Sequence, residues 1–231
     1  MTMKPYLFLS GNYLNNTQDE NGVIVNVTNI NESVPYEQIV YFTDIYGNIV
    51  NRTIDTLVLQ DTNIKNMTVQ AYTGSYTNFL ALSGNTSDTV ILKAATSVTT
   101  SSIKITIPDD GTNPEYITAK IGIYGFICNL FALTDSNYKI EANEGGYRVV
   151  NGAYIHYADY KKWVGKISIE NLEKAQFDLL TAQADTGEMT VVPYEELEID
   201  EIYNCAVKRE YSYELDRKTQ LFKLDLELNE L

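Results

Sequence analysis

The chain has very few of the residues on which most active sites depend. Its 231 residues include one histidine and one tryptophan. A single histidine, His156, cannot build a histidine-rich metal site, and its neighbours Tyr154 and Ala158 cannot serve as acid or base partners in a Ser-His-Asp relay. The sequence therefore predicts a protein that is not an enzyme and has no catalytic residue, no cofactor and no metal ligand.

Cysteine and long apolar segments are also scarce. Only Cys128 and Cys205 are present, and both lie in apolar, strand-like contexts that favour two buried free thiols. A disulfide between them is the alternative, although the domain boundary predicted below separates the two residues. The apolar run at residues 6–9 is only as long as a strand, so we expect neither a signal peptide nor insertion into a membrane.

Basic residues are outnumbered by acidic ones. The chain has 17 Lys and Arg against 31 Asp and Glu, which gives a formal net charge of -14. No basic patch is available to release counterions from a phosphate backbone, so nucleic acid is excluded as a partner. The 18 tyrosines, by contrast, are abundant. An apolar ring with a polar tip suits subunit contacts and also sugar platforms, so the count leaves both possibilities open.

Alternation of apolar and polar residues dominates the first half of the chain. Residues 54–60, 67–72, 101–107 and 116–124 each have the period of a half-buried strand, with turn residues between them. Short strands of this kind indicate a β-sandwich or jelly roll. We therefore predict a mainly β protein, in which an N-terminal β-sandwich or jelly roll is followed by a smaller β-rich domain with one helix.

Composition shifts near residue 133, and glycines follow at 145–146. These features predict a domain at residues 1–133, a linker at 134–146 and a second domain at 147–231. In the second domain, Asn151-Gly152 predicts a hairpin turn.

A helix is expected near residues 171–184, with Asn171 as its cap and Gly187 as its stop. Helical spacing is followed by Leu172, Ala175, Leu179 and Ala182.

Two resemblances add to this reading. The order of strand 54–59, the polar turn Asp61-Thr62-Asn63 and strand 67–72, followed by strands 102–107 and 117–125, resembles a discoidin-like (galactose-binding-like) jelly roll. The second half, with a strand entered at Trp163, one helix and a terminal acidic strand at 224–228, looks like small structural proteins of phage tail tips and baseplates. This chain departs from the commonest arrangement of that group because its jelly roll comes first.

Two groups of residues are candidates for an interaction surface. The aromatic group is Tyr154, Tyr157, Tyr160 and Trp163, and the acidic group is Glu195, Glu196 and Glu198. We interpret the aromatic group as an interface or core cluster, with a sugar platform as the alternative. We interpret the acidic group as a solvated loop or a rim that meets a basic partner, with the paired carboxylates of a glycosidase as the alternative.

A separate acidic turn, Asp109-Asp110-Gly111, offers oxygen ligands of the kind that calcium prefers, although it lacks the spacing of an EF-hand. As a turn it needs no metal, and we interpret it as a turn.

The leading hypothesis is a non-enzymatic structural component of a phage tail, baseplate or tail-like particle. The resemblance implies other tail proteins as partners and copies of the chain itself in a homo-oligomeric ring. It also implies a location in the virion after synthesis in the host cytoplasm. The alternative is a carbohydrate-binding module that recognises a cell-surface polysaccharide, and the two hypotheses are compatible in one protein.

Overall fold

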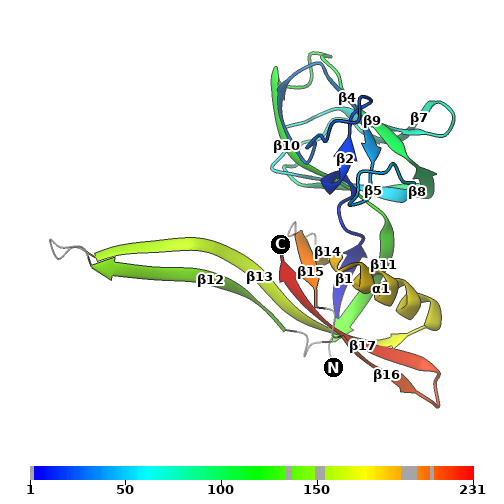
Figure 1. Cartoon of the computed structure of the whole chain (residues 1–231), viewed down its shortest axis with the longest axis vertical. Coiled ribbons are helices and arrows are strands. Elements are labelled where there is room, and N and C mark those ends of the chain that lie inside the picture. The colour runs from blue at the N-terminus through cyan, green and yellow to red at the C-terminus, as the bar shows by residue number, and fades with distance from the viewer. Residues whose placement is uncertain (1–2, 134–136, 149–153, 194–201, 209–210) are drawn as a thin grey trace. The chain divides into compact units, whose positions relative to one another are not determined.

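The computed structural model describes residues 3–133, 137–148, 154–193, 202–208 and 211–231 (Figure 1). These residues form a mainly β protein with a single α-helix, as predicted. The chain divides into two compact units, Ser10–Phe126 and a second unit made of Met1–Leu9 with Ile127–Leu231.

The first unit contains a 3₁₀-helix and nine strands. They are η1 (Tyr13–Asn15), β2 (Thr17–Gln18), β3 (Asn29–Ser33), β4 (Tyr36–Phe42), β5 (Arg52–Gln60), β6 (Met67–Tyr72), β7 (Tyr76–Leu82), β8 (Val90–Thr100), β9 (Ser102–Ile107) and β10 (Tyr116–Tyr124). The other unit contains β1 (Met3–Leu9), β11 (Phe126–Leu133), β12 (Asn137–Arg148), β13 (Tyr154–Leu172), α1 (Lys174–Thr186), β14 (Glu188–Pro193), β15 (Tyr203–Val207), β16 (Ser212–Asp216) and β17 (Leu221–Glu230).

The first unit is an antiparallel sandwich of two sheets. One sheet has the order β3-β10-β5-β8 and the other has the order β2-β4-β9-β6-β7. On β9, Ile103, Ile105 and Ile107 are fully buried, whereas Lys104 and Thr106 between them are partly exposed. The alternation predicted for this strand is therefore confirmed, and its apolar face forms part of the core between the two sheets.

The two ends of the sandwich are joined by hydrogen bonds. The backbone N–H of Ser10 donates to the carbonyl of Gly125 at 2.9 Å, and the N–H of Gly125 donates to Ser10 Oγ at 2.9 Å. A Cβ atom at position 125 would lie 2.8 Å from the carbonyl oxygen of Thr53, so only glycine fits there. The sandwich therefore begins and ends at one place.

The second unit is built on one eight-stranded sheet. Its order is β11-β1-β14-β15-β17-β13-β12, and β16 also pairs with β17. β1 is antiparallel to β14, with Tyr6 opposite Pro193 and Leu9 opposite Thr190. Tyr6 and Phe8 are fully buried in the core of this unit.

This arrangement divides the chain differently from the predicted domains 1–133 and 147–231 with a linker at 134–146. Residues 1–9 and 127–133 belong with the C-terminal half, and residues 137–146 are part of strand β12. The physical reason is that an apolar run at residues 6–9 predicts a strand but not which sheet that strand joins. Gly145 and Gly146 pair with Tyr157 and His156, so they lie in a strand.

The predicted helix is confirmed as α1, and so is its stop. Gly187 has a left-handed φ of 85° and its N–H donates to the carbonyl of Ala184 at 3.0 Å. The predicted cap, Asn171, is wrong. Asn171 lies two residues before Glu173, which caps the helix through a capping box with Gln176.

The buried face of α1 differs from the set of residues that follows helical spacing in the sequence. Leu180 and Ala184 are fully buried, and the ring of Phe177 stacks on Phe222 at 4.3 Å between centroids. Leu179, which belongs to that set, is 54% exposed, and Leu172 belongs to β13. The spacing was helical, but a weakly amphipathic helix fits several phases, and packing on β17 selects the face that contains Phe177.

Candidate interaction surfaces

Strands β12 and β13 form a two-stranded ribbon beyond their sheet. Their register runs from Asn137 opposite Lys166 to Arg148 opposite Tyr154. β17 pairs with β13 only over residues 164–172. Among the described strands, residues 154–163 therefore pair with β12 alone, and Figure 1 shows this ribbon as a long hairpin leaving the rest of its unit.

The predicted aromatic residues all lie on this ribbon. Tyr154, Tyr157, Tyr160 and Trp163 belong to β13 and precede the first residue that pairs with β17. The register shifts between Asn143 and Glu144, which leaves Asp159 without an opposite residue. This β-bulge interrupts the strand alternation between Tyr157 and Tyr160.

Two further predictions concern residues outside the described part of the chain. β12 and β13 pair as an antiparallel hairpin, whereas the turn predicted at Asn151-Gly152 lies outside the described residues. The acidic candidates Glu195, Glu196 and Glu198 also lie outside the described residues, so neither interpretation of this group is tested.

The edge strand β16 offers a second open surface. It pairs with β17 from Ser212 opposite Asp225 to Asp216 opposite Leu221, and no other described strand pairs with it. Every residue of β16 is exposed, including Tyr213 at 59% and Leu215 at 44%. An exposed strand edge with apolar side chains is a template for pairing with another chain.

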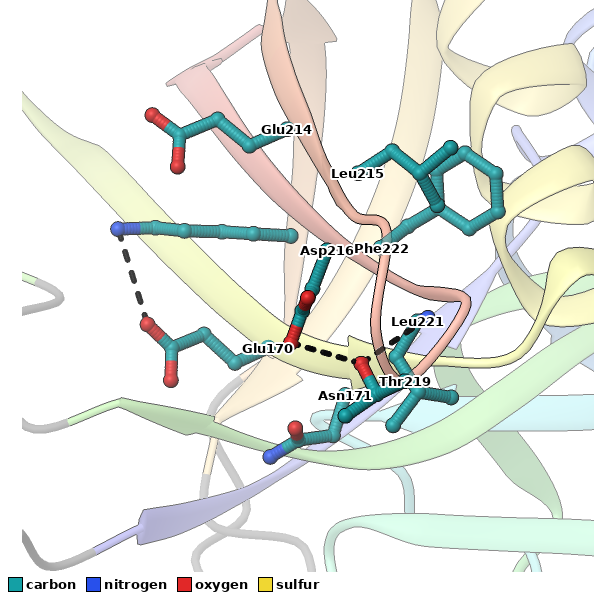
Figure 2. Close-up of a pocket in the computed structure, with 9 residues that line it drawn as sticks. Glu170, Asn171, Glu214, Leu215, Asp216, Thr219, Leu221 and Phe222 are labelled. Atoms are coloured by element: carbon teal, nitrogen blue, oxygen red, sulfur yellow. Dashed lines mark hydrogen bonds and ion pairs between the residues drawn. The ribbon is translucent and has the colours of Figure 1, made fainter.

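A cavity of about 290 Å³ lies beside this hairpin (Figure 2). Asp216 accepts hydrogen bonds from the N–H of Lys218 at 2.8 Å and from Thr219 Oγ1 at 2.9 Å. The pKa of Asp216 is lowered, and the hydrogen bond from the Lys218 N–H is the largest cause. A general acid needs the opposite shift. Glu170 is 3.8 Å from Lys223 Nζ, so Asp216 and Glu170 have structural partners; the third carboxylate of the lining is that of Glu214.

The acidic turn near Asp110 is organised by its own hydrogen bonds. Asp110 Oδ1 accepts from the N–H groups of Thr112 at 2.9 Å and Asn113 at 3.2 Å, and Asn66 donates to Oδ2. These hydrogen bonds lower the pKa of Asp110, and the one from Asn66 is the largest cause. No group of three or more His, Cys, Asp or Glu residues suited to a metal ion occurs among the described residues.

The structure describes the side chain of one of the two cysteines. Cys205 is a buried free thiol, as predicted, whereas the side chain of Cys128 lies outside the described residues.

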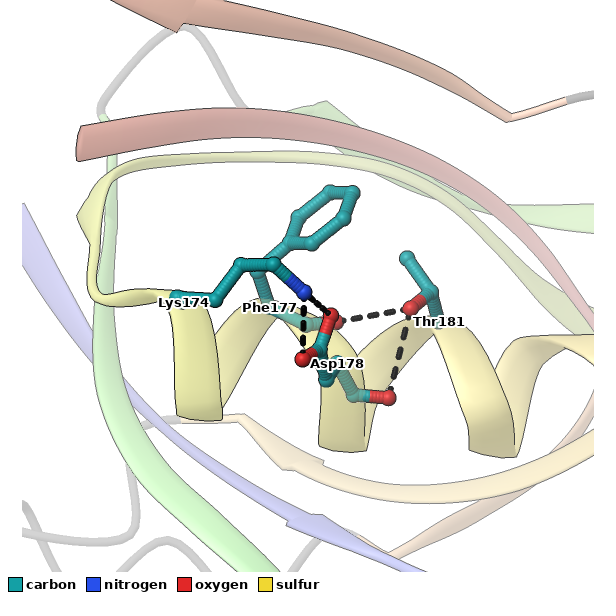
Figure 3. Close-up of polar contacts among 4 residues, drawn as sticks. All are labelled: Lys174, Phe177, Asp178 and Thr181. Carbon is teal, nitrogen blue, oxygen red and sulfur yellow. Dashed lines mark hydrogen bonds and ion pairs between the residues drawn. The ribbon is translucent and has the colours of Figure 1, made fainter. Parts of the chain in front are cut away.

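Polar contacts also run along α1. Lys174 pairs with both carboxylate oxygens of Asp178, and Thr181 Oγ1 donates to the carbonyl of Phe177 at 2.8 Å (Figure 3). These contacts are local to the helix and indicate no site.

Sequence reasoning missed one surface, which lies on the outer side of the five-stranded sheet. Tyr41, Tyr72 and Tyr76 come from β4, β6 and β7, and we call them the tyrosine face. The rings of Tyr72 and Tyr76 are 5.3 Å apart, and Tyr76 Oη lies 3.1 Å from Ser102 Oγ. Each strand showed alternation, but the sequence does not specify the strand order that brings the three tyrosines together.

No helix in the described part of the chain is long and apolar enough to cross a membrane. No family model, curated protein or solved structure matches the chain. Functional inference therefore depends on the surfaces described above.

Proposed function

We propose that this chain is a non-enzymatic structural component of a phage tail, baseplate or tail-like particle, in which it contacts other tail proteins and copies of itself in a ring. The main support is the β12–β13 ribbon. An isolated two-stranded ribbon is at best marginally stable in water, because it buries little apolar surface. A partner that adds a strand would satisfy its outer backbone groups and stabilise it.

The composition of the ribbon supports a protein partner. Tyrosine and tryptophan are enriched at the centres of protein interfaces, and β13 has three tyrosines and the chain's one tryptophan between residues 154 and 163. The exposed edge of β16, with Tyr213 and Leu215, would provide a second strand-to-strand contact.

Exposed apolar side chains on the sandwich support further contacts. Ile24 is 85% exposed, Ile45 is 80% exposed and Tyr46 is 83% exposed, and all three lie in loops. Adjacent exposed apolar side chains, as at Ile45 and Tyr46, are suited to a surface that becomes covered in an assembly. In the proposed role, the acidic group at Glu195, Glu196 and Glu198 would meet a basic neighbour and fix its register.

The proposal is tested by shortening the ribbon. Ala142 and Lys161 are opposite each other, so residues 143–160 can be replaced by Asn-Gly without changing the register of the remaining strands. We expect the shortened chain to fold but to be missing from purified particles. Asp109→Ala, an exposed change on the sandwich, serves as the control and should be incorporated normally. Incorporation of the folded, shortened chain at the level of the unaltered chain would contradict the proposal.

A further inference from the structure

The tyrosine face is continuous with a row of polar side chains on the same side of the sheet. Tyr41 is opposite Ser102, and Gln70 is opposite Lys104. The intervening residues Val40 and Ile103 point the other way and are fully buried. The outer face of this sheet therefore presents tyrosine rings at one end and amide and charged groups along its middle.

The aromatic end is held by contacts between its own residues. Tyr72 and Tyr76 meet at an interplanar angle of 59°, and Tyr72 remains 44% exposed. Tyr41 is opposite Ser102, whose hydroxyl lies 3.1 Å from Tyr76 Oη, so Tyr41 and Tyr76 approach the same serine. The electrostatic interaction with Tyr76 is the largest cause of the raised pKa of Tyr41. The Thr100 hydroxyl donates to the backbone carbonyl of Tyr72 at 2.9 Å, which fixes the strand that presents the ring.

The polar row offers hydrogen-bonding groups of both kinds. Gln70 Nε2 donates to Asn78 Oδ1 at 3.0 Å, which leaves the Gln70 carbonyl oxygen and the Asn78 amide group for a ligand. Lys104 Nζ is 2.8 Å from Glu37 Oε1. Beyond Glu37 lies a surface depression of about 250 Å³, which is also lined by Asp19, Glu20, Asn21, Gln38 and Ile39.

We infer that this outer face binds an uncharged oligosaccharide. A sugar ring has apolar C–H faces and hydroxyl edges, so an aromatic surface next to amide and carboxylate groups is complementary to it. A polyanionic glycan is disfavoured by the charges of Asp19, Glu20 and Glu37, which exceed the single charge of Lys104. A protein partner is disfavoured because interface centres are depleted of charged residues, whereas this row contains an ion pair.

The inference belongs to the sandwich and does not depend on the ribbon. It is tested by titrating the purified full-length chain with three uncharged polysaccharides, dextran, galactomannan and mixed-linkage β-glucan, and with heparin as the anionic comparison. We expect binding to at least one uncharged polysaccharide and weaker binding to heparin. Binding to none of the three, or equal binding to heparin, would overturn the inference.

Variants then locate the site. Tyr72→Ala removes an exposed ring and should weaken binding about tenfold, which corresponds to the loss of one aromatic contact. Asn78→Ala removes an exposed amide and should also weaken polysaccharide binding. Tyr46→Ala removes an exposed tyrosine outside this face and should leave binding unchanged, as should the shortened ribbon. Unchanged binding by both Tyr72→Ala and Asn78→Ala would place the glycan elsewhere and contradict the inference.

Discussion

At the scale of single residues, several carboxylates of this acidic chain have a structural role. Asp44 Oδ1 accepts from the N–H groups of Tyr46 and Asn48, each at 2.9 Å, and Asp19 Oδ1 accepts from the N–H of Asn21 at 2.9 Å. Side chains that bond their own backbone two residues on are typical turn formers. Hydrogen bonds lower the pKa of both carboxylates. The largest cause is the side-chain hydrogen bond from Asn48 at Asp44, and the backbone hydrogen bond from Val23 at Asp19.

The lowered pKa of Asp110 predicts how one turn responds to acid. A carboxyl whose pKa is lower in the folded state than its ordinary 3.8 stabilises the fold once ionised, and this stabilisation disappears as pH falls through the folded value. Asp110→Ala should therefore lower the thermal midpoint at pH 7 more than Asp109→Ala does. The gap should shrink in acid, once the pH has fallen below the lowered folded-state pKa of Asp110 and the carboxyl is protonated. Circular dichroism melts at pH 7 and in acid measure it, and a gap of constant size would contradict the assignment.

The buried thiol of Cys205 should be unreactive. Its pKa is raised to about 12, mainly by burial and also by the charge of Glu230, so very little thiolate exists at pH 8. In a Cys128→Ser background, we expect a thiol reagent to modify Cys205 only as fast as the protein unfolds. Adding urea should therefore accelerate labelling sharply. Rapid labelling of the native variant would show that the thiol is accessible.

At the scale of elements, α1 packs against both strands of the β16–β17 hairpin. Its Phe177 ring stacks on Phe222 of β17 and meets Tyr213 of β16 edge to face at 5.2 Å. Leu180 and Ala184 complete the buried side of the helix. Packing of this helix therefore supports the open edge strand that we propose as a contact.

Two adjacent leucines test the face of α1. Leu180→Ala creates a cavity in the core and should lower the free energy of unfolding by about 2–5 kcal/mol. Leu179→Ala changes a side chain that is 54% exposed and should alter it by no more than about 0.5 kcal/mol. Urea unfolding of the two variants makes the comparison. Equal losses would mean that the helix packs through a different face.

At the scale of the whole molecule, the sandwich is an insertion between two neighbouring strands. β1 and β11 are adjacent in the sheet, and residues 10–125 lie between them in sequence. The hydrogen bonds between Ser10 and Gly125 bring the ends of the insert together. An insert whose ends meet can join two adjacent strands without disturbing their pairing.

Fragments test this organisation. Residues 10–126 contain a complete two-sheet core and should unfold cooperatively alone. Residues 147–231, the domain predicted from composition, lack Tyr6 and Phe8 and should not fold. Joining residues 1–9 to 127–231 through a short glycine linker restores β1 and should restore folding. Circular dichroism and thermal unfolding measure all three, and a cooperatively folded 147–231 fragment would contradict the division.

Local patterns predicted much of the fold, and non-local choices account for the rest. The alternation at residues 101–107 predicted β9, and Gly187 predicted the end of α1, because neighbouring residues determine both. The partner of β1 is β14, whose paired residues lie more than 180 positions away, and no local signal specifies it. The aromatic residues of β13 were predicted as candidates, whereas the tyrosine face depends on strand order and was missed.

The central claim is that this chain is a structural subunit of a tail or tail-like particle. It is tested most directly by antibody labelling of purified particles in the electron microscope, with particles from cells lacking the chain as the control. The account predicts label confined to the tail tip or baseplate. Particles that assemble normally and show no label anywhere would contradict it.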